Sequence, residues 1–412
     1  MQHADAQRKA VVMEQSVSEP MAPSEPEDFS FVLGGPLYQL YLRTRLARPP
    51  LELLHRRIIA VALITWAPLW LLTAINGQAL GGVSVPFLKD LDGHARFLLS
   101  LPLLIFAEFF VHQRIRATVR QFINRRLIAP EDLPRFESAI ASTRWLRNSM
   151  GIEILVLLIA FVGGYWLWKD WTALHIATWW GERGANQMVN LTLAGYWYVF
   201  VSLPIFRFIL FRWYSRLLIW YRFLWLVAKI PLRLNALHPD RAAGLGFLGN
   251  SVFAFAPVLL AHTILLSALI MSRIWHEGAE LPAFKLDIVG IVALLMIIVL
   301  LPQVFFIVQL TRARRAGSRE YGALGSRYVE DFRQKWLAGA APQNEQLVGS
   351  ADIQSLADLA NSFEVVSEMR TLPISRNTVM RLVVLIVLPL LPLTLTMIPL
   401  SEIVDRAIKI LI

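Results

Sequence analysis

The chain contains no cysteine among its 412 residues. This absence excludes disulfide bonds, thiolate zinc sites, covalent c-type haem and cysteine-ligated iron–sulfur clusters. It also means that cysteine usage gives no information about the redox compartment. Any bound group would need other ligands, and we expect no cofactor.

Charged residues are also scarce. They make up 17% of the chain, whereas roughly a quarter of a soluble chain is charged. Hydrophobic residues make up 56%, and they are gathered in blocks without charge, which is typical of a membrane protein. The net charge of +10 would suggest nucleic-acid binding in a soluble protein, but basic loops are ordinary in a membrane protein. We therefore expect no nucleic-acid partner.

Sequence signatures of common enzymes are missing as well. The chain has no P-loop, nucleophile elbow, H-E-x-x-H motif or kinase signature. The first thirty residues are polar and hold several acids and prolines, without the apolar core of a cleavable leader. The sequence thus indicates no catalytic residue and no reaction class.

Seven apolar blocks are long enough to cross a bilayer as helices, which takes about 20 residues each. They run over Ile58–Asn76, Phe97–Gln113, Met150–Trp168, Met188–Phe206, Asn250–Ser272, Ile288–Gln309 and Leu382–Leu400. Prolines interrupt several of them, which neighbouring helices make tolerable. The pattern predicts an all-α protein, a polytopic transmembrane helix bundle of about seven spans.

Lysine and arginine are distributed unevenly between the segments that flank these blocks. The segment before the first block and every second segment after it carry more basic residues than any of the others. Because basic loops stay in the cytoplasm, we expect a bacterial inner (cytoplasmic) membrane protein with a cytoplasmic N-terminus and a periplasmic C-terminus. The outer loops hold several tryptophans, which favour the membrane interface. These are Trp171, Trp179, Trp180 and Trp275.

The inner segments are predicted to be amphipathic helices. Arg114–Asn148 is broken at Pro130 and Pro134, and Trp213–Ile230 mixes aromatic with basic residues, as expected of a helix in the inner interface. A third inner segment repeats apolar residues at helical spacing from Ile353 to Val366.

The predicted organisation has four parts. They are a disordered polar tail (1–35), a six-span membrane region with basic cytoplasmic helices (36–311), a cytoplasmic helical segment (312–378), and the seventh span with a short amphipathic C-terminus (379–412).

Ionisable residues inside the spans are the first candidates for a functional site, because burying them is costly. Counted along their helices, Glu108, Glu153 and Arg207 lie at one depth, roughly 7–9 Å inside the inner boundary. His112 is on the same helix face as Glu108. The four residues predict a polar ligand-binding site between helices. The structural alternative is a salt-bridge cluster, or an Arg207 side chain that extends to the interface. Two metal ligands without a third predict no metal site.

His262 falls near the middle of its predicted span. A midplane histidine can relay protons or ligate haem, although no second axial ligand is evident at its depth. The alternative is a neutral imidazole that is hydrogen-bonded to a neighbouring helix, near Thr263 or Gln303.

A glycine-rich turn precedes the fifth span. Its glycines formally match G-x-G-x-x-G, but no strand precedes them, so the dinucleotide interpretation fails on its context. A turn that enters a helix exposes N–H groups, which favours a phosphate, a carboxylate or a lipid headgroup. The alternative is close helix packing with an aspartate cap. The candidate residues are His238, Asp240, Arg241, Gly244 and Gly246.

These features leave three hypotheses about function. The first is a transporter or channel-like protein for an ion or a small anionic solute. The second is a membrane-embedded enzyme that acts on a lipid headgroup, with Glu108, His112, His238 and Asp240 as its polar set. The third is a structural or assembly subunit of a membrane complex. Expected partners are membrane lipids, anionic at the cytoplasmic face, together with a second copy of the chain or a membrane-complex partner.

Overall fold

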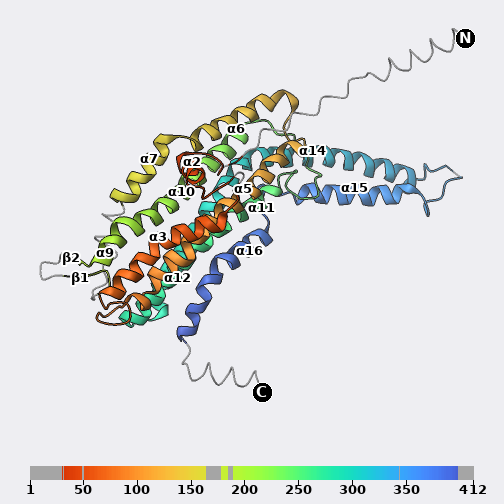
Figure 1. The fold of residues 1–412 in the computed structure, drawn as a ribbon. Coiled ribbons are helices and arrows are strands. Elements are labelled where there is room, and N and C mark those ends of the chain that lie inside the picture. The colour runs from red at the N-terminus through yellow and green to blue at the C-terminus, as the bar shows by residue number, and fades with distance from the viewer. Residues whose placement is uncertain are drawn as a thin grey trace, which may run out of the picture.

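The computed structural model describes residues 30, 32–48, 51–163, 178–183, 189–342 and 344–397. Within these ranges the protein is almost entirely helical (Figure 1). One small antiparallel sheet joins β1 (Gly181–Arg183) to β2 (Val189–Leu191). The all-α prediction is confirmed.

The helices follow one another with short connections, and several continue through a 3₁₀ or π turn into the next. In chain order they are α2 (Pro36–Arg43), α3 (Leu54–Ile75), α4 (Leu91–His94), α5 (Leu101–Asn124), α6 (Leu133–Arg147), α7 (Met150–Leu158), α9 (Leu193–Trp197), α10 (Leu203–Val227), α11 (Phe247–Ser251), α12 (Ala256–Glu277), α13 (Lys285–Leu300), α14 (Ile307–Phe332), α15 (Ala351–Ser367) and α16 (Arg376–Val387).

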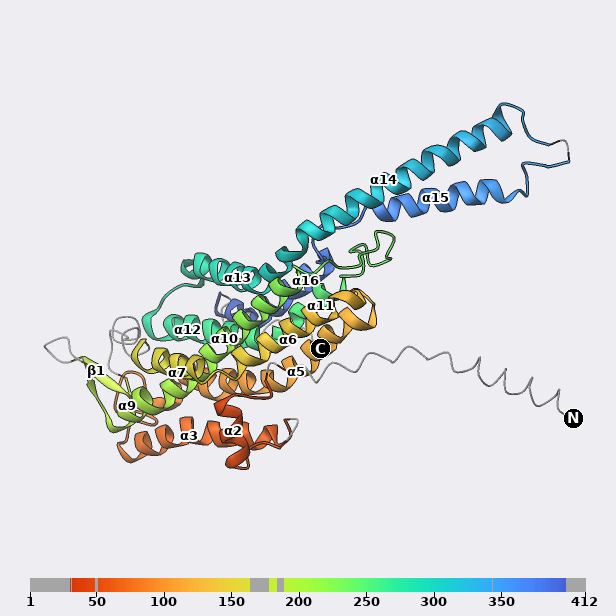
Figure 2. The same cartoon turned by 90° about the horizontal axis from the view of Figure 1, so that it is seen from above.

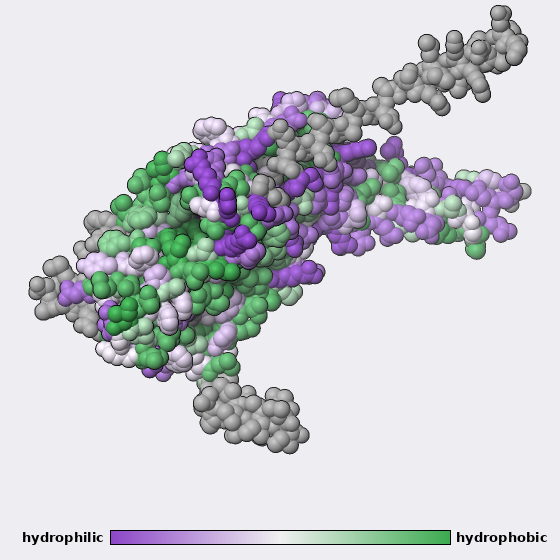
Figure 3. Space-filling model, viewed as in Figure 1, coloured by the Kyte–Doolittle hydropathy of each residue, from purple (hydrophilic) through white to green (hydrophobic). Residues whose placement is uncertain are grey.

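Six helical stretches of the described chain are long and apolar enough to cross a membrane. They are Leu54–Ile75, Leu91–Asn124, Leu193–Val227, Phe247–Glu277, Leu281–Leu337 and Arg376–Met397. The pair Pro130–Arg147 and Met150–Val162, bent by 45°, makes a seventh if it counts as one span. Exposed apolar side chains cover the body formed by these helices, as a bilayer requires (Figure 3). The chain is therefore a multi-pass membrane protein.

Local sequence signals set several helix boundaries. The Ser149 and Ser375 side chains accept hydrogen bonds from the backbone N–H of Ile152 and Thr378, which caps the first turns of α7 and α16. At the other end of a span, α12 stops at Gly278, whose φ of 66° suits glycine.

The spans lie side by side, and the molecule has two unlike ends. The β1–β2 hairpin lies at one end, whereas α14 and α15 project from the other as a long helical hairpin (Figures 1 and 2). Gly317 in α14 allows close approach at the base of this hairpin, since a Cβ there would meet Ala236 and Val366. The apolar repeat that ends at Val366 is therefore a helix docked on α14, as its spacing predicts.

One stretch differs from its predicted form. Residues 213–227 do not form a separate interfacial helix but continue α10 without a break. Trp213 and Trp220 are buried, and so is Arg216. The helix can stay inside the bundle because its arginines meet carboxylates there and do not need water. Trp179 is also buried, with 0% exposure, rather than lying at the outer interface.

Some predicted features lie outside the described residues. These are most of the N-terminal tail, residues 164–168 of the third block, Met188, Trp171 and the C-terminal residues 398–412. Of the tail, Ser30 and residues 32–35 are described, and Val32 is buried against the bundle.

Candidate functional site

Five charged side chains from four helices meet inside the bundle. We call them the buried charge cluster, and they are Arg57 (α3), Glu108 (α5), Glu153 (α7), Arg212 and Arg216 (both α10). Arg212 and Arg216 are four residues apart, so one face of α10 presents both. Glu108 and its three arginine partners are buried.

Glu108 is the centre of this cluster. Its Oε2 lies 2.7 Å from Arg57 Nη1, while its Oε1 lies 2.7 Å from Arg212 Nη1 and 3.3 Å from Arg216 Nη1. Glu153 Oε1 lies 3.3 Å from Arg212 Nε. Three guanidinium groups face two carboxylates, so the cluster carries one excess positive charge. Buried charges of this kind are tolerated only when they are paired and hydrogen-bonded.

The segment before α3 covers the cluster. The backbone N–H of Leu37 donates to Glu153 Oε2 at 3.0 Å, and Arg57 Nη2 donates to the carbonyl of Leu51 at 3.4 Å. The Tyr41 ring lies 5.6 Å from the Arg57 guanidinium carbon. Among the described residues, nothing accepts a hydrogen bond from the buried Arg57 Nε. This segment therefore seals the cluster.

His112 is engaged beside the cluster rather than in it. Its Nδ1 lies 2.8 Å from the Ser30 hydroxyl oxygen, which also accepts the backbone N–H groups of Val32 and Leu33. Because that oxygen already accepts twice, its own proton points to His112 Nδ1. The histidine thus tethers the N-terminal segment to α5.

Arg207 does not join the buried charge cluster. No ion pair links it to Glu108 or Glu153 in the part of the chain that the structure describes. Depth along a helix was the basis of the predicted grouping, but it ignores rotation about the axis. Arg207 precedes Arg212 by five residues, which turns its side chain by roughly 140° around α10. Of the four predicted residues, the structure brings Glu108 and Glu153 together through Arg212 and leaves Arg207 on another face.

Arg207 lines a cavity of about 390 Å³ on that other face. We call it the α10 cavity. Its wall comes from four candidate spans and is mostly apolar, except for Asp92, Arg96, Arg207 and His262. Arg207 and His262 lie near the middle of their spans, Leu193–Val227 and Phe247–Glu277. The cavity therefore places polar groups within the membrane-spanning part of the molecule.

The two arginines of the α10 cavity are held differently. Arg96 donates to Asp92 Oδ2 at 2.6 Å and to the Tyr198 hydroxyl at 2.7 Å, so its charge is neutralised and its position fixed. Arg207 is half-buried and makes no hydrogen bond or ion pair within the described residues. An arginine in a membrane span is costly unless something compensates its charge. The cavity consequently has one positive charge without a counter-ion in the described chain.

His262 is hydrogen-bonded on both sides of its ring. Its Nδ1 lies 2.6 Å from the carbonyl of Val258, which can only accept, so this nitrogen carries the proton. The Tyr214 hydroxyl, 2.6 Å from Nε2, then donates. The geometry is that of a neutral imidazole bonded to a neighbouring helix, and the partner is Tyr214 rather than Thr263 or Gln303.

The glycine-rich turn brings its predicted residues together around Asp240. The backbone N–H groups of Ala242 and Gly244 donate to Asp240 Oδ1 at 2.8 and 3.1 Å, and that of Gly246 donates to Oδ2 at 2.9 Å. The backbone N–H groups of the turn, which an anion would need as donors, are therefore already bound by the Asp240 carboxylate. Asp240 holds the turn together but does not cap α11, whose N-cap residue is Gly246.

Electrostatics and neighbouring segments agree with that arrangement. Burial raises the pKa of the Asp240 carboxyl, but the backbone N–H donors and His238 outweigh it, so its pKa lies below the ordinary value. Arg241 pairs with Glu368, and Arg370 donates to the carbonyl oxygens of Asp240 and Arg241. The turn thus anchors the chain that follows α15.

Sequence reasoning missed Arg57, Arg212 and Arg216, which were interpreted only as orientation charges of the inner segments. The spacing of Arg212 and Arg216, together with the neighbouring Trp213, was an available signal. Trp213 Nε1 donates to the carbonyl of Leu104 at 2.9 Å and so fixes α10 against α5.

The described residues contain no group of three or more His, Asp or Glu side chains that could hold a metal ion. No protein family, no curated protein and no solved structure matches the chain. The geometry of the α10 cavity and of the buried charge cluster is therefore the basis for any functional proposal.

Proposed function

We propose that the chain is a transporter or channel-like protein for a small anionic solute in a bacterial inner membrane. The observation that carries this proposal is Arg207, half-buried in a cavity between membrane spans and without a counter-ion in the described chain. A polar site at mid-membrane depth between packed helices is typical of transporters. A small anion that entered the cavity would supply the missing charge.

The surroundings suit this role. Arg96 is held by Asp92 and Tyr198, so the cavity keeps its shape and offers Arg207 as its uncommitted cation. On the opposite face, the buried charge cluster ties α10 to α3, α5 and α7. This support restricts the position of α10 and hence of Arg207.

Anion flux into proteoliposomes tests the proposal directly. We expect the purified chain to move at least one of three probes, namely chloride, inorganic phosphate and succinate. Arg207→Gln should reduce the flux roughly tenfold or more, because an interaction with a charged group contributes about 1.5–3 kcal/mol. The matched control is Arg273→Gln, which changes an exposed arginine at the far end of α12. If none of the probes moves, or if both variants behave like the wild type, the proposal fails.

We further propose that the N-terminus and the α14–α15 hairpin are cytoplasmic, because the basic segments share that side. The absence of native cysteine makes a labelling test clean. Cysteines placed singly at Ser84 and Ala279 should react with an impermeant thiol reagent in intact cells. Those at Ser138 and Ser350 should react only after the membrane is opened. The reverse pattern would contradict this orientation.

The enzymatic hypothesis has less support in the geometry. Three arginines hold Glu108, Ser30 engages His112, and Asp240 is bound by its own turn. A lipid-modifying site would need at least one of these groups to face a substrate.

A role in assembly has one observation in its favour. The α14–α15 hairpin projects from the membrane body (Figure 2). It exposes apolar side chains, including Val329, Ile353 and Phe363. Replacing Ile353 and Phe363 by serine should then remove a co-purifying partner without changing anion flux. Loss of flux with no change in bound partners would count against this second role.

A further inference from the structure

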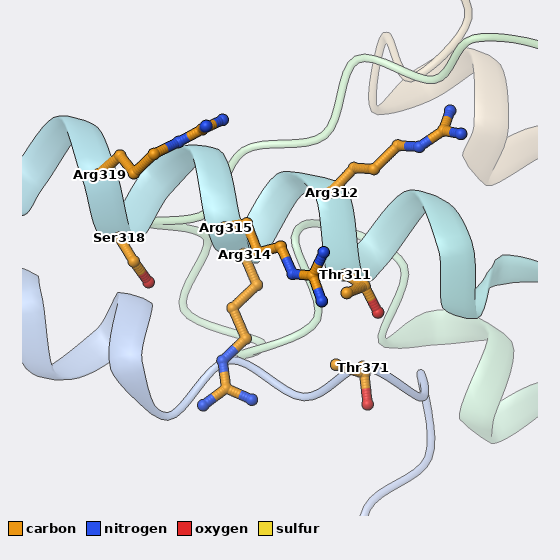
Figure 4. A pocket seen from close by; sticks show the side chains of 7 residues that line it. All are labelled: Thr311, Arg312, Arg314, Arg315, Ser318, Arg319 and Thr371. Carbon is orange, nitrogen blue, oxygen red and sulfur yellow. The ribbon is translucent and has the colours of Figure 1, made fainter.

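A second polar cavity, distinct from the α10 cavity, lies where the α14–α15 hairpin leaves the membrane body. It has a volume of about 760 Å³. Figure 4 shows its lining, which consists of Thr311, Arg312, Arg314, Arg315, Ser318, Arg319 and Thr371. We call it the arginine pocket. Six of these residues come from α14, and Thr371 comes from the segment that follows α15.

The arginine pocket contains four positive charges and no acidic side chain in its lining. Arg314 is partly committed, since its Nη2 donates to the carbonyl of Ser367 at 2.7 Å. Arg312, Arg315 and Arg319 make no ion pair or hydrogen bond with any residue that the structure describes. Arg315 follows Arg312 by three residues and precedes Arg319 by four, and like charges at such spacings destabilise a helix. An anion bound beside them would reduce this repulsion.

The walls of the pocket are fixed by packing at the base of the hairpin. Gly317 lies against Ala236 and Val366, where no side chain would fit. The Arg370 backbone N–H donates to the carbonyl of Arg241 at 2.7 Å and so holds the segment that contains Thr371. Thr371 is thereby kept beside the Thr311 end of the pocket, whereas Ser318 lies about two turns further along α14 (Figure 4).

The length of the helix that leads into the arginine pocket indicates where the pocket lies relative to the membrane. The helical run from Lys285 to Phe306 consists of α-helix to Leu300 and 3₁₀-helix after it. At about 1.5 and 2.0 Å per residue it spans roughly 36 Å, enough to cross the roughly 30 Å of a hydrocarbon core. Thr311 and Arg312 follow about one turn later. The pocket consequently begins at the level where lipid phosphates lie, on the side of the membrane that carries the hairpin.

We infer that the arginine pocket binds a phosphoryl anion. A guanidinium offers a planar pair of N–H donors that fits two phosphoryl oxygens, and a hydroxyl of the lining, such as that of Thr311 or Thr371, can donate to a further oxygen. The anion can come from the headgroup of an anionic phospholipid or from a soluble phosphate. Bound there, it would join α14 to the segment after α15 and stabilise the base of the hairpin. This inference does not depend on the proposed transport function.

Binding measurements on the full chain test the inference and separate the two sources. The first arm uses native mass spectrometry in neutral detergent to count bound phosphatidylglycerol against phosphatidylcholine. The second arm uses calorimetry with inorganic pyrophosphate. The test variant is Arg312→Gln/Arg315→Gln, which keeps Arg314 and its bond to Ser367. The control is Arg327→Gln/Arg333→Gln, which removes the same charge from α14 and its continuation, outside the lining of the pocket.

We expect the test variant to lose affinity for the anion about tenfold or more, and the control to keep it. Preference for phosphatidylglycerol that only the test variant loses identifies a lipid headgroup. Pyrophosphate binding with the same dependence, and no lipid preference, identifies a soluble phosphate. Absence of both kinds of binding in the wild type, or an equal loss in the two variants, overturns the inference. Unchanged thermal unfolding of the test variant would show that its fold is intact.

Discussion

On one face of α10, Arg212 and Arg216 lie against Glu108, which also binds Arg57. On the other face, Arg207 lines a cavity with Arg96 and has no carboxylate of its own among the described residues. The same helix therefore carries two arginines that are ion-paired within the fold and one, Arg207, that is not ion-paired with any described residue. The ion-paired Arg212 and Arg216 stabilise the bundle, whereas the side chain of Arg207 is available to a ligand.

The Glu108→Gln substitution should produce the largest effect on stability. It would leave three arginines facing Glu153 alone in a buried site, and breaking a buried ion pair from one side costs about 3–5 kcal/mol. We expect the free energy of unfolding in mixed micelles to fall by that amount, or the yield of folded protein to collapse. Glu131→Gln, at an exposed glutamate on the α6 side, is the control and should change little. A stable Glu108→Gln protein would show that the cluster does not support the bundle.

Asp240 offers an intermediate case, because backbone N–H groups rather than arginines bind its carboxylate. Asp240→Asn keeps one acceptor and turns an N–H₂ group toward the N–H of Gly246. We expect a loss of about 1–2 kcal/mol in the free energy of unfolding near neutral pH, as for a lost cap. The matched control is Asp358→Asn, at an exposed position of α15.

The stability difference between the wild type and Asp240→Asn should also depend on pH, in a direction that the pKa of Asp240 determines. The pKa of Asp240 is lowered in the folded chain, so its contribution is fully present above the ordinary aspartate pKa of about 4. It is lost as the pH falls from there through the lower folded pKa. The stability difference between the wild type and Asp240→Asn should therefore shrink below about pH 4. A difference that stayed constant or grew on acidification would contradict this assignment.

The smallest effect on stability is expected for Arg207→Gln. Because the described chain offers this arginine no counter-ion, its removal deletes no ion pair and relieves the cost of an uncompensated charge, so the free energy of unfolding should not fall by more than about 0.5 kcal/mol. Unfolding in mixed micelles, measured on the protein that is used for the flux assay, checks this. A destabilisation as large as that of Glu108→Gln would mean that Arg207 has a structural partner, and the contrast between the two faces of α10 would disappear.

The arginines of the chain show which features of the structure can be predicted from the sequence and which cannot. Apolar blocks and basic flanks were enough to predict a multi-pass helix bundle and to select Glu108 and Glu153 as unusual. They could not separate Arg207 from Arg212, because both stand at the same border of apolar and basic sequence. What distinguishes them is the direction of each side chain around α10 and the helix that it meets there.

The glycine-rich turn shows a related limit. Its composition permits two structures, one in which N–H groups bind an external anion and one in which Asp240 binds them. Local sequence contains both the donors and the competing acceptor. Only the backbone path, which passes through positive φ at Arg241, Ala243 and Gly244, brings that acceptor to the donors.

Hydrophobic block length by itself determined that this chain crosses a membrane several times, because in lipid the backbone must satisfy its hydrogen bonds within each helix. Tertiary structure alone decided which charges pair. An ion pair requires two side chains from distant segments to meet within about 4 Å, and Arg57, Glu108 and Arg212 come from three helices whose mutual rotation no single segment encodes. The position of Arg207 in the α10 cavity and that of Thr371 against the arginine-rich start of α14 depend on that same packing.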